Sequence, residues 1–136
     1  MDSFAAKWQP TVLSLFRFIT GLLLFQYGVA KIFKFPVVPY FAQVELFSRI
    51  GFAGTLELIL GAMLMLGLFT RLVAFILSGE MAFAYFLGHM FKGETPVWFP
   101  LLNGGTAAIL FCFACLYLAT AGGGPISLDA TLRRKI

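Results

Sequence analysis

Long apolar runs fill most of this chain, and short segments rich in proline, glycine or charge separate them. The runs cover residues 11–33, 51–69, 71–91 and 98–121. An α-helix rises about 1.5 Å per residue and needs about 20 apolar residues to cross the hydrocarbon of a bilayer, so each run is long enough to span. The pattern therefore predicts an all-α, membrane-embedded, antiparallel four-helix bundle that forms a single domain over residues 1–136.

The segments between the runs predict how the spans are connected. Pro10 precedes the first run and is expected to open its helix, because proline is favoured in a first turn. Residues 36–49 mix aromatic and charged side chains and are too polar to cross, so we expect a short interfacial helix there. The corner at Thr70 and Arg71 is so short that the third span must return antiparallel beside the second. Glycines 122–124 and Pro125 end the fourth run.

Each predicted span also carries polar or ionisable residues. They are Arg17, Gln26, Lys31, Glu57, Glu80, His89 and Asn103. An unpaired charge at the centre of a bilayer costs at least roughly 2.5–3.5 kcal/mol, so these side chains are expected to face one another inside the bundle. A rise of ~1.5 Å per residue places Arg17 and Glu80 at similar depths near the inner edge, which predicts an intramembrane ion pair between them.

The other polar residues fall in the outer half of the predicted bundle. We predict a small ligand-binding pocket there, formed by Gln26, Lys31, Glu57, His89 and Asn103. Gln26 is its weakest member, because it lies on the opposite side of a straight first span from Arg17. An alternative hypothesis is that these residues only hold the helices together, since polar contacts between membrane helices contribute about 0.6 kcal/mol each.

Helical spacing adds two expectations about how the spans pack. Gly21 and Gly28 lie on the same stripe of the first span, and Gly54 and Gly61 lie on one stripe of the second with Glu57, so both stripes are predicted to be packing faces. In the third span, Glu80 and His89 are nine residues apart and fall on opposite sides of a straight helix. Both can face inward only if that span bends.

Two motifs with possible chemistry are ranked lower. Cys112 and Cys115 form a Cys-x-x-Cys pair that could exchange electrons with a quinone, but they lie in mid-span, where a thiolate is poorly solvated, and a packing role is the stronger hypothesis. His89 is the single histidine, so a bis-histidine haem or a multi-histidine metal site cannot be built within one chain. We predict no metal site, and no catalytic residue can be assigned.

Composition and charge agree with a membrane protein. Hydrophobic residues make up 60% of the chain and charged residues 12%, which excludes soluble and disordered classes. The net charge of +4 comes from lysines and arginines scattered near the ends of the spans, which suits interface anchors and not a nucleic-acid-binding stripe. The first run contains Arg17 and lacks an Ala-x-Ala cleavage site, so we expect a retained helix. The basic tail, residues 133–135, favours both termini in the cytoplasm.

The order and spacing of these residues resemble the DoxX family of small four-span bacterial membrane proteins. The shared features are Arg17, Gly21, Gly28, Lys31, Glu57, Gly61, Gly67-x-x-Thr70-Arg71, Met81, Ala84, Asn103-Gly104-Gly105 and Gly122-x-Gly124-x-x-Ser127-x-Asp129. The resemblance covers almost the whole chain and implies the bacterial inner (plasma) membrane. It departs at Thr106, where family members often carry a glutamate, so a proton relay through that carboxylate would be missing here.

The resemblance implies a quinone-linked or partner-docking subunit of a membrane oxidoreductase system, with a quinone as ligand and a membrane or soluble oxidoreductase as partner. Two alternatives stay open. One is a small transporter or channel, built as a homo-oligomer, with Arg17, Glu57 and Glu80 as stations on its path. The other is a non-catalytic scaffold. Whether the chain is an enzyme by itself also stays open.

Overall fold

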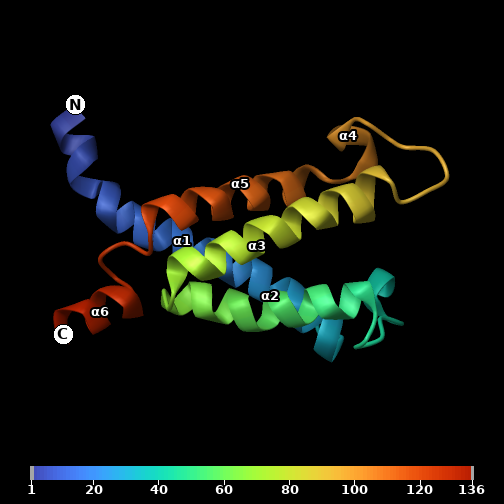
Figure 1. Ribbon diagram of the computed structural model, residues 1–136, viewed down its shortest axis with the longest axis horizontal. Helices are drawn as coiled ribbons and strands as arrows, with labels where there is room; N and C mark the ends of the chain where they lie inside the picture. Colours follow the sequence, from blue (N-terminus) through green and yellow to red (C-terminus); the bar gives the residue numbers. More distant parts are fainter. Residues whose placement is uncertain (1, 136) are drawn as a thin grey trace.

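The computed structural model describes residues 2–135, and every regular element in that range is a helix (Figure 1). The α-helices are α1 (Asp2–Phe33), α2 (Arg49–Leu66), α3 (Thr70–Tyr85), α4 (Pro100–Asn103), α5 (Thr106–Ala121) and α6 (Leu128–Lys135). A 3₁₀ helix, η1 (Pro39–Phe41), follows α1, and a π-helix, η2 (Phe86–Met90), continues α3. The predicted all-α class is confirmed.

Three helical segments are long and apolar enough to cross a membrane. They are α1, α2 and the continuous segment made of α3 and η2. Helix α5 is also apolar but has 16 residues. Many large apolar side chains on these helices are exposed, including Phe75 on α3 and Phe113 on α5, each at 64%. Such a surface suits lipid and not water, so the chain is a helical membrane protein.

Helices α1 and α2 pack closely along a line of glycines. A Cβ atom added at Gly28 would collide with the backbone nitrogen of Leu58. One added at Gly21 would lie 2.6 Å from the backbone nitrogen of Met65, which is also too close. The two backbones can approach this far only because these positions carry no side chain. The predicted packing face on the first span is confirmed.

Helices α3 and α5 form a second closely packed pair. Side chains from both pairs meet in one core, where Leu24 of α1, Leu64 of α2, Leu77 of α3 and Leu118 of α5 are fully buried. Figure 1 shows both termini and the corner between α2 and α3 at one end of the molecule, with α4 near the other end. The structure is therefore two helix pairs joined through a shared core.

Helix α1 begins at Asp2, so the prediction that Pro10 opens it is wrong. A proline inside a helix removes one N–H donor and leaves the carbonyl four residues earlier, here that of Ala6, without its helical partner. Residues 2–12 are all exposed, so this carbonyl can be hydrated. The helix therefore continues through the proline, although a proline inside a helix costs about 3 kcal/mol.

The interfacial helix predicted for residues 36–49 is replaced by irregular chain, apart from the three residues of η1. Pro36 and Pro39 have no N–H to donate, which prevents a regular helix across them. Lys34 takes up part of the missing hydrogen bonding: its Nζ donates to the carbonyl oxygens of Lys31 at 2.8 Å and Val44 at 2.7 Å. The loop is therefore held by a side chain.

The predicted fourth span is broken into α4 and α5. Gly104 has a φ of 74° and ends α4, and the side-chain oxygen of Asn103 accepts a hydrogen bond of 2.8 Å from the Gly105 nitrogen. The ring of Tyr85 fills the space where a Cβ on Gly105 would lie. The break therefore depends on glycines and on a neighbouring helix, which an apolar run cannot reveal.

The C-terminal helix α6 begins at Leu128, directly after Ser127. The Ser127 hydroxyl accepts a hydrogen bond of 3.1 Å from the Ala130 nitrogen, in the manner of an N-cap. The Asp129 carboxylate accepts hydrogen bonds from the backbone nitrogens of Phe69 at 2.7 Å and Thr70 at 2.9 Å, where α3 starts. Helix α6 is thereby fastened to the corner between α2 and α3.

Candidate functional site

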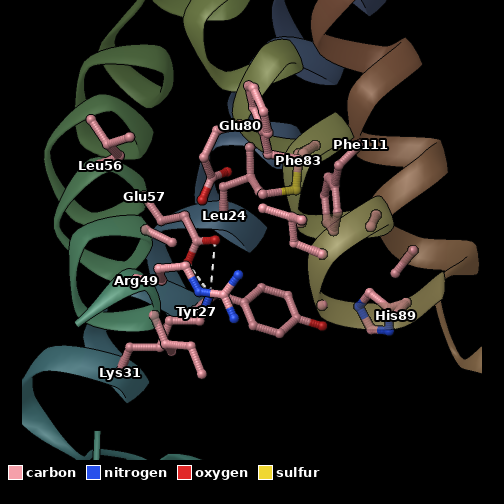
Figure 2. Close-up of a pocket in the computed structure, with 18 of the residues that line it drawn as sticks. Leu24, Tyr27, Lys31, Arg49, Leu56, Glu57, Glu80, Phe83, His89 and Phe111 are labelled. Atoms are coloured by element: carbon pink, nitrogen blue, oxygen red, sulfur yellow. Dashed lines mark hydrogen bonds and ion pairs between the residues drawn. The ribbon is translucent and has the colours of Figure 1, made fainter. Parts of the chain in front are cut away.

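A cavity of about 970 Å³ lies between the helices, and Figure 2 shows side chains that line it. Its walls come from α1, α2, α3, η2, α4, α5 and the loop around η1. Most lining side chains are apolar, such as Leu24, Phe83 and Phe111, and a few polar groups converge among them. A mainly apolar cavity with a few placed polar groups is typical of small-molecule sites.

A buried ion pair occupies one end of the cavity. The Lys31 Nζ lies 2.9 Å from each carboxylate oxygen of Glu57, and the two side chains are 13% and 2% exposed. The same ammonium group lies 5.4 Å from the ring centroid of Phe41 and 5.9 Å from that of Tyr27, within range of cation–π attraction. Lys31 also stands in the last turn of α1, where the helix dipole favours a cation. These contacts compensate for the removal of both charges from water.

Glu80 of α3 is the third ionisable group at this end, and Figure 2 shows its carboxyl group directed toward Glu57. Within the described residues, neither carboxyl oxygen of Glu80 has a hydrogen-bond partner. The predicted ion pair of Arg17 with Glu80 is therefore wrong, and Glu80 belongs to the layer of Glu57 instead. We call Lys31, Glu57 and Glu80 the charged end of the cavity.

Arg17 lies outside the cavity and bonds to backbone carbonyls. Its Nη1 donates to the oxygens of Gly123 at 2.6 Å and Ile126 at 2.8 Å, and its Nη2 donates to the oxygen of Met65 at 3.2 Å. Carbonyls near the ends of helices lack helical partners and can therefore satisfy a guanidinium group without a carboxylate. Arg17 thus ties the chain after α5 to α1 and α2.

Figure 2 shows His89 on the other side of the cavity from Lys31 and Glu57, and Asn103 also lines the cavity. The His89 Nδ1 lies 3.1 Å from the Asn103 carbonyl oxygen. The Asn103 side chain donates to the Val97 carbonyl at 2.9 Å and the Tyr85 hydroxyl at 3.2 Å, while its own oxygen is bonded to Gly105. Because its amide is already occupied, Asn103 shapes the cavity and offers little to a ligand.

The π-helix η2 explains how Glu80 and His89 come to line one cavity. Their spacing places them on opposite sides of a straight α-helix. A π turn is wider than an α turn and changes the direction of the side chains that follow, and such turns are frequent at functional sites. The sequence required a departure from a straight α-helix in the third span, and the π turn at Phe86–Met90 is such a departure.

The structure brings Lys31, Glu57, His89 and Asn103 around the cavity, and their role in binding stays a prediction. Gln26 is exposed on α1 and does not line it, so its predicted place in the pocket is wrong. Sequence reasoning missed Tyr27, which does line it. Tyr27 lies four residues before Lys31, and that spacing puts two side chains on one helix face, so the signal was present.

Arg49, another lining residue, was also missed, because it was assigned to the interfacial segment. It is the first residue of α2, and Figure 2 shows its side chain beside the charged end. An arginine at a helix end reads from sequence as an interface anchor. Only the fold shows that this one reaches the cavity.

The two cysteines are free, and neither lines the cavity. Cys115 is fully buried in the core, and the Ser78 hydroxyl donates a hydrogen bond of 2.8 Å to the Cys112 carbonyl. This packing suits small apolar residues, and the redox alternative gains no support from it. No group of three or more His, Cys, Asp or Glu side chains suited to a metal ion occurs within residues 2–135.

These features define a helical membrane protein with an apolar cavity that is charged at one end. The family model for DoxX matches residues 12–90, which include Lys31, Glu57 and Glu80. An uncharacterized protein of Haemophilus influenzae is 35% identical over 134 residues, which cover 95% of this chain and 96% of that one. The chain therefore belongs to the DoxX family. No solved structure matches it.

Proposed function

We propose that this chain is a membrane subunit that binds a quinone in its cavity and thereby serves a membrane oxidoreductase system. The observation that carries the proposal is the combination of an apolar cavity of about 970 Å³ with the buried Lys31–Glu57 pair at one end. A quinone has the matching form, because an apolar tail is joined to a head with two carbonyl oxygens. The tail would lie among the apolar walls and the head at the charged end.

Two basic side chains supply hydrogen-bond donors for such a head. The Lys31 ammonium has three N–H donors, and its two bonds to Glu57 leave one for a ligand. The Arg49 guanidinium also lines the cavity and carries five donors. Carbonyl oxygens accept hydrogen bonds from both groups, whereas a hydrocarbon gains nothing from them.

The proposal includes four crossings of the bacterial inner membrane, with both termini in the cytoplasm. Helix α5 has 16 residues and is about 24 Å long, slightly short of a hydrocarbon core of about 30 Å. The apolar residues of α4, directly before it, would complete the fourth crossing. Both termini then lie on one side, and the basic tail favours the cytoplasm for that side.

Titration with a short-chain ubiquinone or menaquinone analogue tests the binding step. A ligand that binds only the folded protein stabilises it by about 2.7 kcal/mol at a hundredfold excess over Kd, so the thermal midpoint of the purified protein should rise. A saturated hydrocarbon of the same chain length should produce a much smaller rise. Absence of any rise with both quinone classes would refute the proposal.

Variants connect the rise to the charged end. Lys31→Met/Glu57→Leu removes both partners of the ion pair and leaves neither of them as an isolated buried charge, so the protein should still fold. The quinone concentration needed to raise its thermal midpoint should increase at least tenfold. Lys7→Met is the matched control, because it removes a lysine from the exposed first part of α1. An unchanged response in the double variant would place the quinone elsewhere.

The transporter alternative loses one of its three stations, because Arg17 lies outside the cavity and is bound to backbone carbonyls. Flux of protons or solutes into liposomes tests it directly. Affinity purification from the native membrane tests for a partner, and a co-purifying oxidoreductase supports the docking role. If the protein shows no quinone response and no partner, the scaffold hypothesis is the one that remains.

A further inference from the structure

We infer that Glu57 and Glu80 form a carboxyl pair that holds one proton at the charged end of the cavity. The two side chains come from adjacent helices, α2 and α3, and Figure 2 shows the Glu80 carboxyl group directed toward Glu57, whose own oxygens bond to Lys31. Glu57 is 2% exposed, and both oxygens of Glu80 are enclosed. The pair is therefore shielded from bulk water.

Hydrogen bonding requires the proton. An ionised carboxylate is only an acceptor, so two ionised groups in this position would repel each other and form no bond. Glu80 has no donor from any other group in residues 2–135. A buried ionised carboxylate without a partner costs several kcal/mol. A proton on Glu80 removes that charge and lets its hydroxyl donate to the carboxylate of Glu57.

The charges around Glu80 also indicate that the carboxyl pair holds one proton. The groups that face it are Lys31 from α1, Glu57 from α2 and the thiol of Cys115 from α5. Lys31 donates two hydrogen bonds to Glu57, and the exposed Arg49 does not bond to Glu80. Arg49 is exposed to solvent, so the enclosed groups are one cation and two carboxyl groups, and one proton neutralises the remaining negative charge. Neighbouring carboxyl groups in other proteins share a proton for the same reason.

The bound proton changes what the cavity offers a ligand. It turns an end with two acceptor groups into one that also carries a carboxylic acid, which is a hydrogen-bond donor. This consequence rests on the proposed quinone function, because a carbonyl head at the charged end would accept from that acid once its hydroxyl turns from Glu57 to the ligand. The proton itself is a property of the ligand-free chain and can be measured without any quinone.

Infrared spectroscopy of ligand-free protein labelled with ¹³C-glutamate provides the test. Wild-type protein at neutral pH should show the carbonyl stretch of one protonated glutamate per chain, shifted by the label. Glu80→Gln should lose the band. Glu57→Gln should lose it as well, because Glu80 then becomes the counter-ion of Lys31 and gives up its proton. Glu94→Gln, which alters an exposed carboxylate in the loop before α4, should keep it.

Three results would overturn the inference. They are no protonated glutamate in wild-type protein at neutral pH, a band that survives Glu80→Gln, and a band that survives Glu57→Gln. The last would mean that burial alone protonates Glu80, without a pair. Lys31→Met should double the band, since both carboxyl groups then need a proton. If Glu80→Gln fails to fold, the spectra of wild-type protein and Glu57→Gln still decide whether the pair holds a proton. A negative quinone titration would refute the proposed function without changing either spectrum.

Discussion

At the scale of single residues, Asp129 shows how one side chain in α6 completes an element far away in the sequence. Its carboxylate serves as an N-cap for α3 by accepting from the backbone nitrogens of Phe69 and Thr70. Burial would raise the pKa of this carboxyl group, but the hydrogen bonds from the two backbone N–H groups and the charge of Arg133 hold the pKa below its usual range. The helix start and the tail therefore stabilise each other.

Replacing this carboxylate gives a stability difference that depends on pH. Asp129→Asn should lower the free energy of unfolding by about 1–2 kcal/mol at neutral pH, because the amide keeps one acceptor oxygen where the carboxylate has two, so one of the two backbone N–H groups loses its partner. Because the pKa is lowered in the folded protein, the charge stabilises fully above the ordinary aspartate value near 4, and this stabilisation is lost as the pH falls from there through the lowered pKa of the folded state. Thermal unfolding from pH 7 to pH 3 should therefore show the difference shrinking toward the acid end.

The control for that measurement is Asp2→Asn, which removes an exposed carboxylate from the first turn of α1. It should change the midpoint little at either pH. A gap between wild type and Asp129→Asn that stays constant down to pH 3 would contradict the role assigned to the charge.

Residue partners were predictable from the sequence only in part. Lys31 and Glu57 were placed in one pocket because both interrupt apolar runs at the outer end, and the structure brings them into contact. Depth along the helix fixed the layer of Arg17 but not the direction of its side chain. Its acceptors are backbone carbonyls, such as that of Gly123, and these leave no trace in a pattern of side chains. Equal depth alone therefore paired Arg17 with the wrong group, the carboxylate of Glu80.

At the scale of elements, the contact between α1 and α2 depends on glycine. Gly28→Ala should lower the stability by about 1–3 kcal/mol, because the added Cβ meets backbone and not a movable side chain. Gly79→Ala in α3 is a matched control, since a Cβ there meets nothing within 4 Å and alanine favours a helix by about 0.5–1 kcal/mol over glycine. Chemical denaturation in one detergent compares the two. Equal effects would show that the packing is looser than the structure indicates.

The same element scale marks the limit of prediction from hydropathy. Apolar length gave the presence and order of the spanning helices, because lipid imposes that length. It did not reveal the break at Gly104, since an apolar run looks alike whether it is straight or broken. Whether a glycine ends a helix depends on what packs beside it, and here the neighbour is Tyr85 from another helix. A departure from a straight α-helix in the third span was foreseeable because two polar residues, Glu80 and His89, required it.

At the scale of the whole molecule, the cavity follows from the way in which the helices pair. Glycines allow α1 and α2 to pack closely, and α3 packs closely on α5, so the two helices of each pair are in close contact. Space remains where the pairs face each other, and the polar residues of separate helices meet there. The sequence identified those residues by their cost in lipid, but the size of the space depends on side chains from many separate segments. No single periodicity encodes it.

Cysteine labelling tests the proposed topology of the whole chain. In a Cys112→Ala/Cys115→Ala background, Glu94→Cys should react with a membrane-impermeant thiol reagent on intact cells, because its loop lies at the end opposite the termini. Asp2→Cys and Leu132→Cys, both at exposed positions, should react only after lysis.

Each other pattern of labelling has one physical meaning. If α5 does not cross, Asp2→Cys and Leu132→Cys lie on opposite sides, so one of them reacts on intact cells and the fourth crossing is refuted. If both react and Glu94→Cys is protected, four crossings stand but the orientation is reversed, and the basic tail would then face away from the cytoplasm against the usual bias of lysine and arginine. The parity of the crossings is therefore measured separately from their direction.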